Sequence, residues 1–213
     1  MLTRWEEWFS ADNLVKDPRI LAAPPTLCAQ ATAVAFLSRG KRRILDLACG
    51  VGRDTFFLQE QGLSVVGVDA SLNGLTAACQ VRQTSRATAE FVAADARHLP
   101  FADQSFDGAY CFGLLHEFVG AGRQDVVRRV MGEFARLLVA GGVLAIAALA
   151  GEPEDGLPQV QLFTRPMFDQ ATAGWHPLEI RCYEDVGCTN QPDYRVWYGL
   201  LEKRQERPDA VDR

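Results

Sequence analysis

Acidic side chains placed around one glycine turn are the residues of this sequence best suited to chemistry. Asp46 lies in an apolar run, and the turn G-V-G at 50–52 follows it. Asp69 and Asp95 each end a later apolar segment. A glycine turn lets a ligand lie directly on the main chain, and free N–H groups at a following helix start can face that ligand. Carboxylates beside such a turn suit an amine, a cation or sugar hydroxyls, whereas they would repel a pyrophosphate.

The segments that carry these groups have the pattern of an open α/β sheet. Residues 43–48 predict a buried strand, and 53–61 predict the helix that follows the turn. Further strands are predicted at 64–69, 90–95, 105–112 and 143–150, and further helices at 26–38, 72–83, 123–139 and 164–172. In a doubly wound sheet the second strand ends beside the first, so Asp69 is expected next to the glycine turn. Its spacing of about 20 residues from the turn is that of an acid that binds ribose hydroxyls.

Two features oppose a dinucleotide-binding turn, whose fingerprint is G-x-G-x-x-G. Counting from Gly50, the third glycine place holds Thr55. In addition, residues 175–183 and 194–203 alternate apolar and polar side chains and predict a closing antiparallel hairpin.

The first 25 residues do not match the core pattern. They carry the aromatic residues Trp5, Trp8 and Phe9, and they end at Pro24 and Pro25. One interpretation is an arm whose aromatic rings pack on the domain, and the other is a lid that excludes water from a substrate pocket.

In the helix expected at 26–38, the apolar face is predicted to consist of Leu27, Ala31, Val34, Ala35 and Leu37.

Composition narrows the classes of protein to which the chain can belong. A net charge of −5 is unlike the basic stripe of a nucleic-acid binder. No run reaches the roughly 18 consecutive apolar residues that a membrane span needs, and no apolar signal-peptide region follows the first residues. The six cysteines form no C-x-x-C or zinc spacing. We interpret them as reduced thiols of a cytoplasmic protein, with a Cys182–Cys188 disulfide as the alternative if both are exposed.

Several motifs resemble those of one enzyme family. D-L-A-C-G-V-G at 46–52 resembles motif I of the class I S-adenosylmethionine-dependent methyltransferases, D-x-x-x-G-x-G. Asp69 matches the motif II acid, and V-A-A-D-A-R-H-L-P-F at 92–101 resembles the motif III region. D-Q-S-F-D at 103–107 and L-L-V-A-G-G-V-L at 137–144 resemble two further phrases of the family. The resemblance covers about residues 42–203, most of the chain.

The resemblance implies a fold and a domain organisation. The fold is an α/β, Rossmann-like doubly wound sheet of seven strands, mostly parallel with an antiparallel C-terminal hairpin strand, and with helices on both faces. We expect a single methyltransferase domain over 1–213, with an arm or lid at 1–25, the core at 26–204 and a charged tail at 205–213.

The resemblance also implies a methyl donor, S-adenosyl-L-methionine, which leaves as S-adenosyl-L-homocysteine, and no metal. Asp46 would meet the donor's amino group, directly or through water, Asp69 its ribose, and Asp95 its adenine. The cofactor-binding set implied in this way is Asp46, Ala48, Gly50, Gly52, Arg53, Asp69, Ala70, Asp95, Ala96 and Phe112. A Gly52→Val protein is expected to fold yet to lose donor affinity.

The acceptor side is less well defined by the sequence. His116 and Glu117 follow the fourth strand and are candidates for a general base, with a purely structural role as the alternative. The substrate candidates are Trp5, Trp8, Phe163 and Arg165, for which ordinary packing is the alternative. We expect a small-molecule acceptor that is methylated on O, N or S, no nucleic-acid or membrane partner, and a monomer or homodimer. A sensor or assembly protein that binds the donor without transferring its methyl group is the alternative function, because the donor motifs do not require a base.

Overall fold

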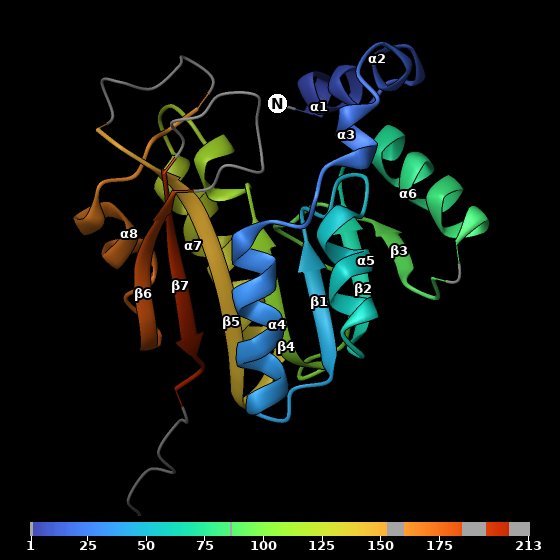
Figure 1. Ribbon diagram of the computed structural model, residues 1–213. Helices are drawn as coiled ribbons and strands as arrows, with labels where there is room; N and C mark the ends of the chain where they lie inside the picture. The colour runs from blue at the N-terminus through green and yellow to red at the C-terminus, as the bar shows by residue number, and fades with distance from the viewer. Residues whose placement is uncertain (1, 86, 153–159, 185–194, 205–213) are drawn as a thin grey trace, which may run out of the picture.

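The computed structural model describes residues 2–85, 87–152, 160–184 and 195–204, which build one seven-stranded sheet. The strand order is β3-β2-β1-β4-β5-β7-β6 (Figure 1). The strands are β1 (Arg43–Leu47), β2 (Ser64–Asp69), β3 (Glu90–Ala93), β4 (Phe106–Phe112), β5 (Leu138–Ala150), β6 (His176–Glu184) and β7 (Arg195–Glu202). Strands β1 to β5 pair in parallel, and β7 is antiparallel to both of its neighbours. The predicted fold class, including the closing hairpin, is confirmed.

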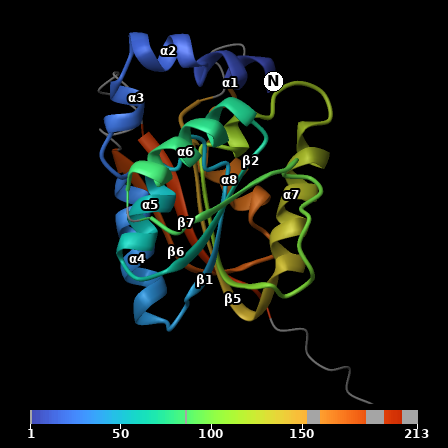
Figure 2. The same ribbon diagram turned by 90° about the vertical axis from the view of Figure 1, so that its right-hand side faces the viewer.

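Helices cover both faces of this sheet. Helices α4 (Leu27–Ser38) and α5 (Arg53–Glu60) lie on one face, and α7 (Arg123–Leu137) and α8 (Arg165–Ala171) on the other (Figure 2). Helix α6 (Leu72–Thr84) packs beside β2 and β3, and the short 3₁₀ helix η1 (Leu115–Glu117) follows β4. Helices α1 (Leu2–Trp8), α2 (Ala11–Lys16) and α3 (Arg19–Ala22) form the arm, which lies above the carboxyl end of β1 (Figure 1).

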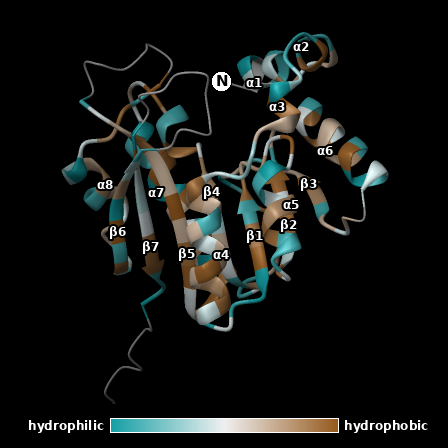
Figure 3. Cartoon of the chain, in the orientation of Figure 1, coloured by the Kyte–Doolittle hydropathy of each residue, from teal (hydrophilic) through white to brown (hydrophobic). Residues whose placement is uncertain are grey.

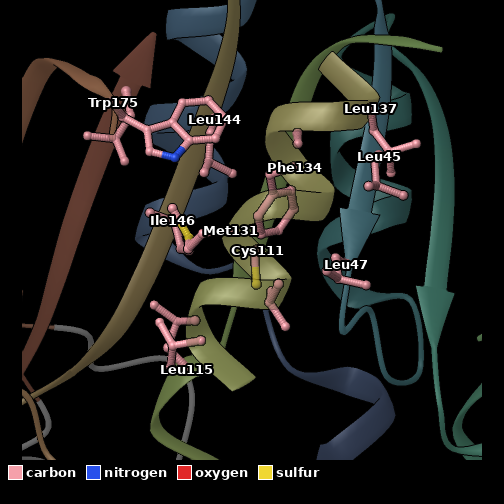
Figure 4. Close-up of a cluster of buried hydrophobic side chains, with 14 of the residues drawn as sticks. Leu45, Leu47, Cys111, Leu115, Met131, Phe134, Leu137, Leu144, Ile146 and Trp175 are labelled. Carbon is pink, nitrogen blue, oxygen red and sulfur yellow. The ribbon is translucent and has the colours of Figure 1, made fainter. Parts of the chain in front are cut away.

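The core consists of two apolar layers, one on each side of the sheet. Successive side chains of a strand point to opposite faces, so Ile44 packs under α4 while Leu45 packs under α7. Phe134 of α7 and Ile146 of β5 belong to the layer on the α7 side (Figure 4). The central strands are apolar along most of their length (Figure 3), as expected for strands covered on both faces. This packing holds the carboxyl ends of β1, β2 and β4 together at one edge.

The predicted apolar face of α4 is wrong. Leu27 and Val34 are 41% and 71% exposed. The helix is apolar on nearly all sides, so hydrophobic periodicity does not select a face. Buried hydroxyls show which side is inward, because the Thr32 hydroxyl bonds with that of Tyr198 at 3.1 Å. The buried residues of α4 are Cys28, Ala29, Thr32, Ala33 and Phe36.

The boundary between α7 and β5 also differs from the prediction. The helix ends at Leu137, and the strand begins at Leu138 with no loop between them. Gly141 and Gly142, which separate the helix predicted at 123–139 from the strand predicted at 143–150, lie inside β5. The ladder with β4 shifts register between Phe106 and Gly108, so the extra residues of β5 are accommodated as a bulge.

One stretch, Arg19–Ser38, is long and apolar enough by mean hydropathy to be considered a membrane span. The structure divides it into α3 and α4 around Pro24 and Pro25. The 12 residues of α4 cover about 18 Å, short of the ~30 Å hydrocarbon core of a bilayer. Its inward side packs on the sheet, which accounts for the apolar composition.

Some expectations fall outside the described residues. These are much of the connection between the segments predicted at 143–150 and 164–172, the connection of the hairpin, Cys188 and the tail at 205–213.

Candidate functional site

The glycine turn at the carboxyl end of β1 has an unusual backbone. Ala48, Gly50 and Gly52 have φ angles of 66°, 53° and 81°, the left-handed region that favours glycine. For Ala48 this conformation costs roughly 1–2 kcal/mol, and such strain persists where the surroundings fix the loop. The N–H groups of Ala48 and Cys49 both donate to the carbonyl of Val68, at 2.8 and 3.1 Å. The turn is therefore fastened to the end of β2.

Asp69 completes this attachment. One of its carboxylate oxygens accepts the Gly50 N–H at 2.8 Å, and the other accepts the Ser71 N–H at 2.8 Å. Burial raises the pKa of Asp69 above its usual range, while these N–H groups act in the opposite direction. The acid predicted to lie next to the glycine turn is thus in direct contact with it.

Asp46 is buried at the end of β1, with 2% of its surface exposed. Its carboxyl group accepts a hydrogen bond from the Thr55 hydroxyl at 2.5 Å. Burial, reinforced by the nearby carboxylates of Asp54 and Asp69, raises the pKa of Asp46 to about 8, against the smaller effects of Thr55 and Arg53. A cation placed beside Asp46 would therefore gain a strong partner. In the sequence, Thr55 stands at the third glycine place of the dinucleotide fingerprint. In the structure, its role is this hydrogen bond to Asp46.

A small cleft of about 50 Å³ opens at this edge of the sheet. Its lining contains four residues of the predicted set, together with Cys49, Asp54 and Tyr110; the four are Asp46, Ala48, Arg53 and Phe112. A larger recess of about 500 Å³ lies at the amino ends of β2 and β3, beside Gln59 and Glu90. Ligands of open α/β sheets bind at the carboxyl ends of the strands, so we place the site at the small cleft.

A buried hydrogen-bond network forms one wall of the cleft. The Asp54 carboxylate accepts the N–H and the hydroxyl of Thr26, both at 2.9 Å, and the hydroxyl of Tyr110 at 2.8 Å. Thr26 also caps α4 by accepting the Ala29 N–H at 2.9 Å. The network fixes the point where the arm joins the core. No local pattern in the sequence indicated it.

Asp54→Ala is expected to lower the free energy of unfolding by about 3 kcal/mol, because it leaves several buried donors without an acceptor. Urea unfolding of both proteins measures this. The matched control is Asp125→Ala, which removes a carboxylate that is 68% exposed and is expected to cost under about 1 kcal/mol. Equal costs for the two variants would contradict the assigned role of Asp54.

His116 and Glu117 lie on η1, at the carboxyl end of β4, and are 7% and 5% exposed. The Nδ1 atom of His116 accepts the Leu149 N–H at 3.3 Å, and its Nε2 atom lies 3.6 Å from the Glu117 carboxylate. Burial lowers the pKa of His116 to about 3, with a smaller contribution from Arg4. The imidazole is then neutral with its proton on Nε2, and the lone pair of Nδ1 accepts the Leu149 N–H. Neither nitrogen is therefore free to take up a proton. This geometry disfavours His116 as a general base and makes it a support for Glu117.

Helix α1 contributes the partners of Glu117. The Arg4 guanidinium forms an ion pair with the Glu117 carboxylate, and the Trp5 indole N–H donates to the same carboxylate at 3.2 Å. Burial raises the pKa of Glu117, while Arg4 and Trp5 act to lower it.

The other end of α1 crosses to the opposite side of the cleft. The Glu6 carboxylate accepts the N–H groups of Leu72 and Asn73, at 2.7 and 3.1 Å, at the start of α6. The Phe9 ring lies against the glycine turn, since a Cβ built on Gly50 would be 3.0 Å from its Cζ atom. The contacts of α1 therefore run from the end of β4 to the start of α6, and α1 lies above the sheet in Figure 2.

Gly52 has a different environment from the one expected. A Cβ built there would meet the rings of Phe56 and Phe91 at 2.9 and 3.0 Å, and its N–H donates to Cys49 at 2.9 Å. Its Cα therefore faces packed side chains. The expectation that Gly52→Val would fold and affect donor affinity alone is thus revised, because the substitution strains the turn itself.

Gly52→Ala is expected to cost about 3 kcal/mol of stability, as backbone strain of about 1–2 kcal/mol adds to overpacking of about 1–3 kcal/mol. Gly62→Ala is the matched control, because its φ is 89° and nothing lies within 4 Å of the added Cβ. It should show the backbone cost alone. Equal losses in urea unfolding would indicate that the rings of Phe56 and Phe91 yield freely.

The remaining predicted donor residues lie at the surface. Asp95 follows β3, and its side chain is 46% exposed. Both of its oxygens accept from the Arg97 guanidinium, which lowers the pKa of Asp95. Ala70 is exposed beside Asp69, and Ala96 packs partly against the core.

Two substrate candidates from the sequence are placed elsewhere. Phe163 is a core residue, 5% exposed, and its ring packs inside the sheet–helix layer, as the alternative of ordinary packing expects. Arg165 pairs with Asp169 along α8 at 2.8 Å and lies 5.6 Å over the Trp197 ring, so its described contacts are structural. Trp8 is 49% exposed, while Trp5 reaches the site through Glu117.

Comparison with known proteins agrees with this geometry. The sequence profile described as "Methyltransferase domain" matches residues 45–146, which contain the glycine turn and Asp69. Residues 45–146 thus match the methyltransferase domain family, and relatives named as methyltransferases support a class I S-adenosylmethionine-dependent methyltransferase.

Named relatives give this domain match its context. The demethylmenaquinone methyltransferase of Thermobifida fusca is 33% identical over 135 residues, covering 62% of this chain and 53% of the relative. An uncharacterized methyltransferase of Synechocystis is 34% identical over 108 residues, covering 51% of this chain and 47% of the relative. The chain thus spans about half the length of these curated relatives. Magnesium protoporphyrin IX methyltransferase of Synechocystis, solved with bound S-adenosylhomocysteine, shares the fold with a TM-score of 0.72 at 14% identity, covering 94% and 99% of the two chains.

Proposed function

We propose that this chain transfers a methyl group from S-adenosyl-L-methionine to an O, N or S nucleophile of a small molecule. The observation that supports this most directly is a pair of carboxylates, the buried Asp46 and the half-buried Asp69, on either side of a glycine turn at the carboxyl edge of the sheet. Relatives named for demethylmenaquinone and for magnesium protoporphyrin IX favour a small-molecule acceptor.

The residues present fit such a donor. Asp46 offers a buried carboxyl group with a raised pKa, which an ammonium group would ionise and bind. One oxygen of Asp69 accepts the Gly50 N–H and the other accepts the Ser71 N–H. Each oxygen keeps a second lone pair, so the carboxylate can also accept two ribose hydroxyls. For Asp95, which follows β3 at the exposed edge, we propose the adenine amino group as the partner. When bound, the donor supplies a methyl group already activated by a positively charged sulfur.

The protein's own contribution is then mainly positioning, which supplies roughly 7–11 kcal/mol when two reactants are held in line. Phe9 and Trp5 supply a cover that excludes water. Pockets for small molecules measure about 300–1,000 Å³, far more than the 50 Å³ of the cleft under the arm. We therefore propose that the arm is a lid, which moves off the glycine turn and closes again over the ligands.

Glu117 is the better candidate for a general base. Its carboxylate lies at the end of β4, and burial raises its pKa toward the range useful for proton transfer. His116, whose Nε2 atom lies 3.6 Å from the Glu117 carboxylate, stabilises the orientation of that carboxylate.

Two experiments separate this proposal from a dinucleotide-binding protein and from a sensor that binds the donor without transferring its methyl group. Calorimetric titration with S-adenosylmethionine, NAD and NADP should show binding of the first compound only. Transfer of labelled methyl from the donor into a cell metabolite extract should then distinguish an enzyme from a donor-binding sensor. Donor binding without any labelled product would favour the sensor.

A further inference from the structure

We propose that the Glu117 carboxylate binds a positively charged nitrogen of the methyl acceptor, and that Arg4 occupies this position when no acceptor is bound. The inference rests on the proposed function and specifies its substrate class: a small molecule that carries an ammonium, amidinium or guanidinium group.

The first observation is that Glu117 is a buried anion whose cation comes from outside the core. The carboxylate is 5% exposed, and both hydrogen bonds described for it come from α1, one from Arg4 and one from Trp5. Its neighbour on the core side, His116, is neutral. A buried carboxylate that stays ionised without a cationic partner is strongly destabilising, so this position favours a positive charge.

The second observation concerns the groups around that charge. The Arg4 guanidinium lies 5.0 Å from the centre of the Trp5 ring, which stacks on Phe9 with centroids 5.5 Å apart. A carboxylate combined with the face of an indole is a recurrent way to bind an organic cation. The arm therefore already shows how a guanidinium fits here.

The third observation is the position of this group relative to the donor site. Trp5 touches Glu117 while Phe9, one turn further along the arm, touches Gly50. The cation position and the glycine turn thus lie under the same short segment. When the arm lifts to admit ligands, Glu117 loses the Arg4 guanidinium, and a cationic acceptor would restore the pairing.

Binding of a series of probes with one shape and different charge tests this. Protein saturated with S-adenosylhomocysteine is titrated calorimetrically with benzylammonium, benzyl alcohol and benzoate. Wild-type protein should bind benzylammonium better than the alcohol and should not bind benzoate. Arg4→Gln should strengthen benzylammonium binding by about tenfold, because a competing cation is removed, and should change binding of the alcohol by less than about threefold.

Two further variants make the result decisive. In the Arg4→Gln background, Glu117→Gln should abolish the preference for benzylammonium over the alcohol. Arg19→Gln is the matched control, since it removes an arginine of the same arm that pairs only locally with Asp17, and it should leave all affinities unchanged. Equal affinity for cation and alcohol in wild type and in Arg4→Gln, or a preference that survives Glu117→Gln, would overturn the inference. Failure of S-adenosylhomocysteine to bind at all would instead contradict the proposed function, so the two failures are distinguishable.

Discussion

Binding of S-adenosylmethionine at pH 7 is expected to release close to one proton, and Asp46→Asn is expected to abolish that release. With a pKa of about 8, the Asp46 carboxyl is largely protonated at pH 7 before the donor binds. A pKa one unit above the pH leaves roughly nine-tenths of the group protonated. The donor's ammonium group stabilises the carboxylate, so the proton leaves on binding. Above about pH 8 the carboxyl is already ionised, and the release should fade.

Calorimetry in buffers of different ionisation enthalpy measures this proton release directly. Asp46→Asn keeps the size of the side chain but has no proton to lose, so its binding enthalpy should not depend on the buffer. We also expect the variant to bind the donor about tenfold to a hundredfold more weakly, as is typical when a charged hydrogen-bond partner is lost. Equal proton release by variant and wild type would show that the ammonium group does not meet Asp46.

The same carboxyl group has a consequence for folding that gives an independent check. The folded-state pKa of about 8 exceeds the usual value of 3.8, so the Asp46 carboxyl contributes most to the free energy of unfolding below about pH 4. Its contribution is lost as the pH rises toward 8, at up to about 1.4 kcal/mol per pH unit. Stability of wild type should therefore fall relative to Asp46→Asn across this window in urea unfolding.

Asp69→Asn is expected to weaken donor binding by about a hundredfold. The carboxylate has acceptor capacity for both ribose hydroxyls besides its bonds to Gly50 and Ser71, whereas asparagine has a single acceptor oxygen. Each charge-assisted hydrogen bond contributes about 1.5–3 kcal/mol, so losing one or two accounts for this factor. Calorimetric titration with S-adenosylhomocysteine measures it.

The control for Asp69→Asn is Asp95→Asn. Asp95 is exposed and already held by Arg97, so its replacement should weaken binding only severalfold. Thermal melting should confirm that both variants remain folded at the temperature of titration. An affinity for Asp69→Asn within about threefold of wild type would exclude the ribose role.

The sequence predicted those parts of the fold whose signals are local. Strand β2 was predicted with its observed bounds, because its β-branched apolar residues end at an acid and a helix cap. The face of α4 could not be predicted, since it depends on the hydroxyls of Tyr110 and Tyr198 that reach the helix from distant strands. The start of β5 was missed because paired glycines usually end a helix, and here a bulge with β4 accommodates them.

The residues of the functional site show the same difference between local signals and long-range contacts. The positions of Asp46 and Asp69 followed from short motifs within single strand–turn units. The ion pair of Arg4 with Glu117 joins residues 113 positions apart, and the Thr26–Asp54 bond joins residues 28 apart. No spacing rule reports such contacts. For His116 and Phe163 the sequence left a site role and a structural role open, because residue type alone does not reveal burial or hydrogen-bond partners.

The central claim is that the donor lies on the glycine turn between Asp46 and Asp69, and a crystal structure with bound S-adenosylhomocysteine tests it most directly. We predict ribose hydroxyls within hydrogen-bond distance of the Asp69 carboxylate and the amino group beside Asp46, with the Phe9 ring displaced from Gly50. A ligand bound in the recess beside Gln59 and Glu90, or one whose ribose and amino group contact neither carboxylate, would contradict the account.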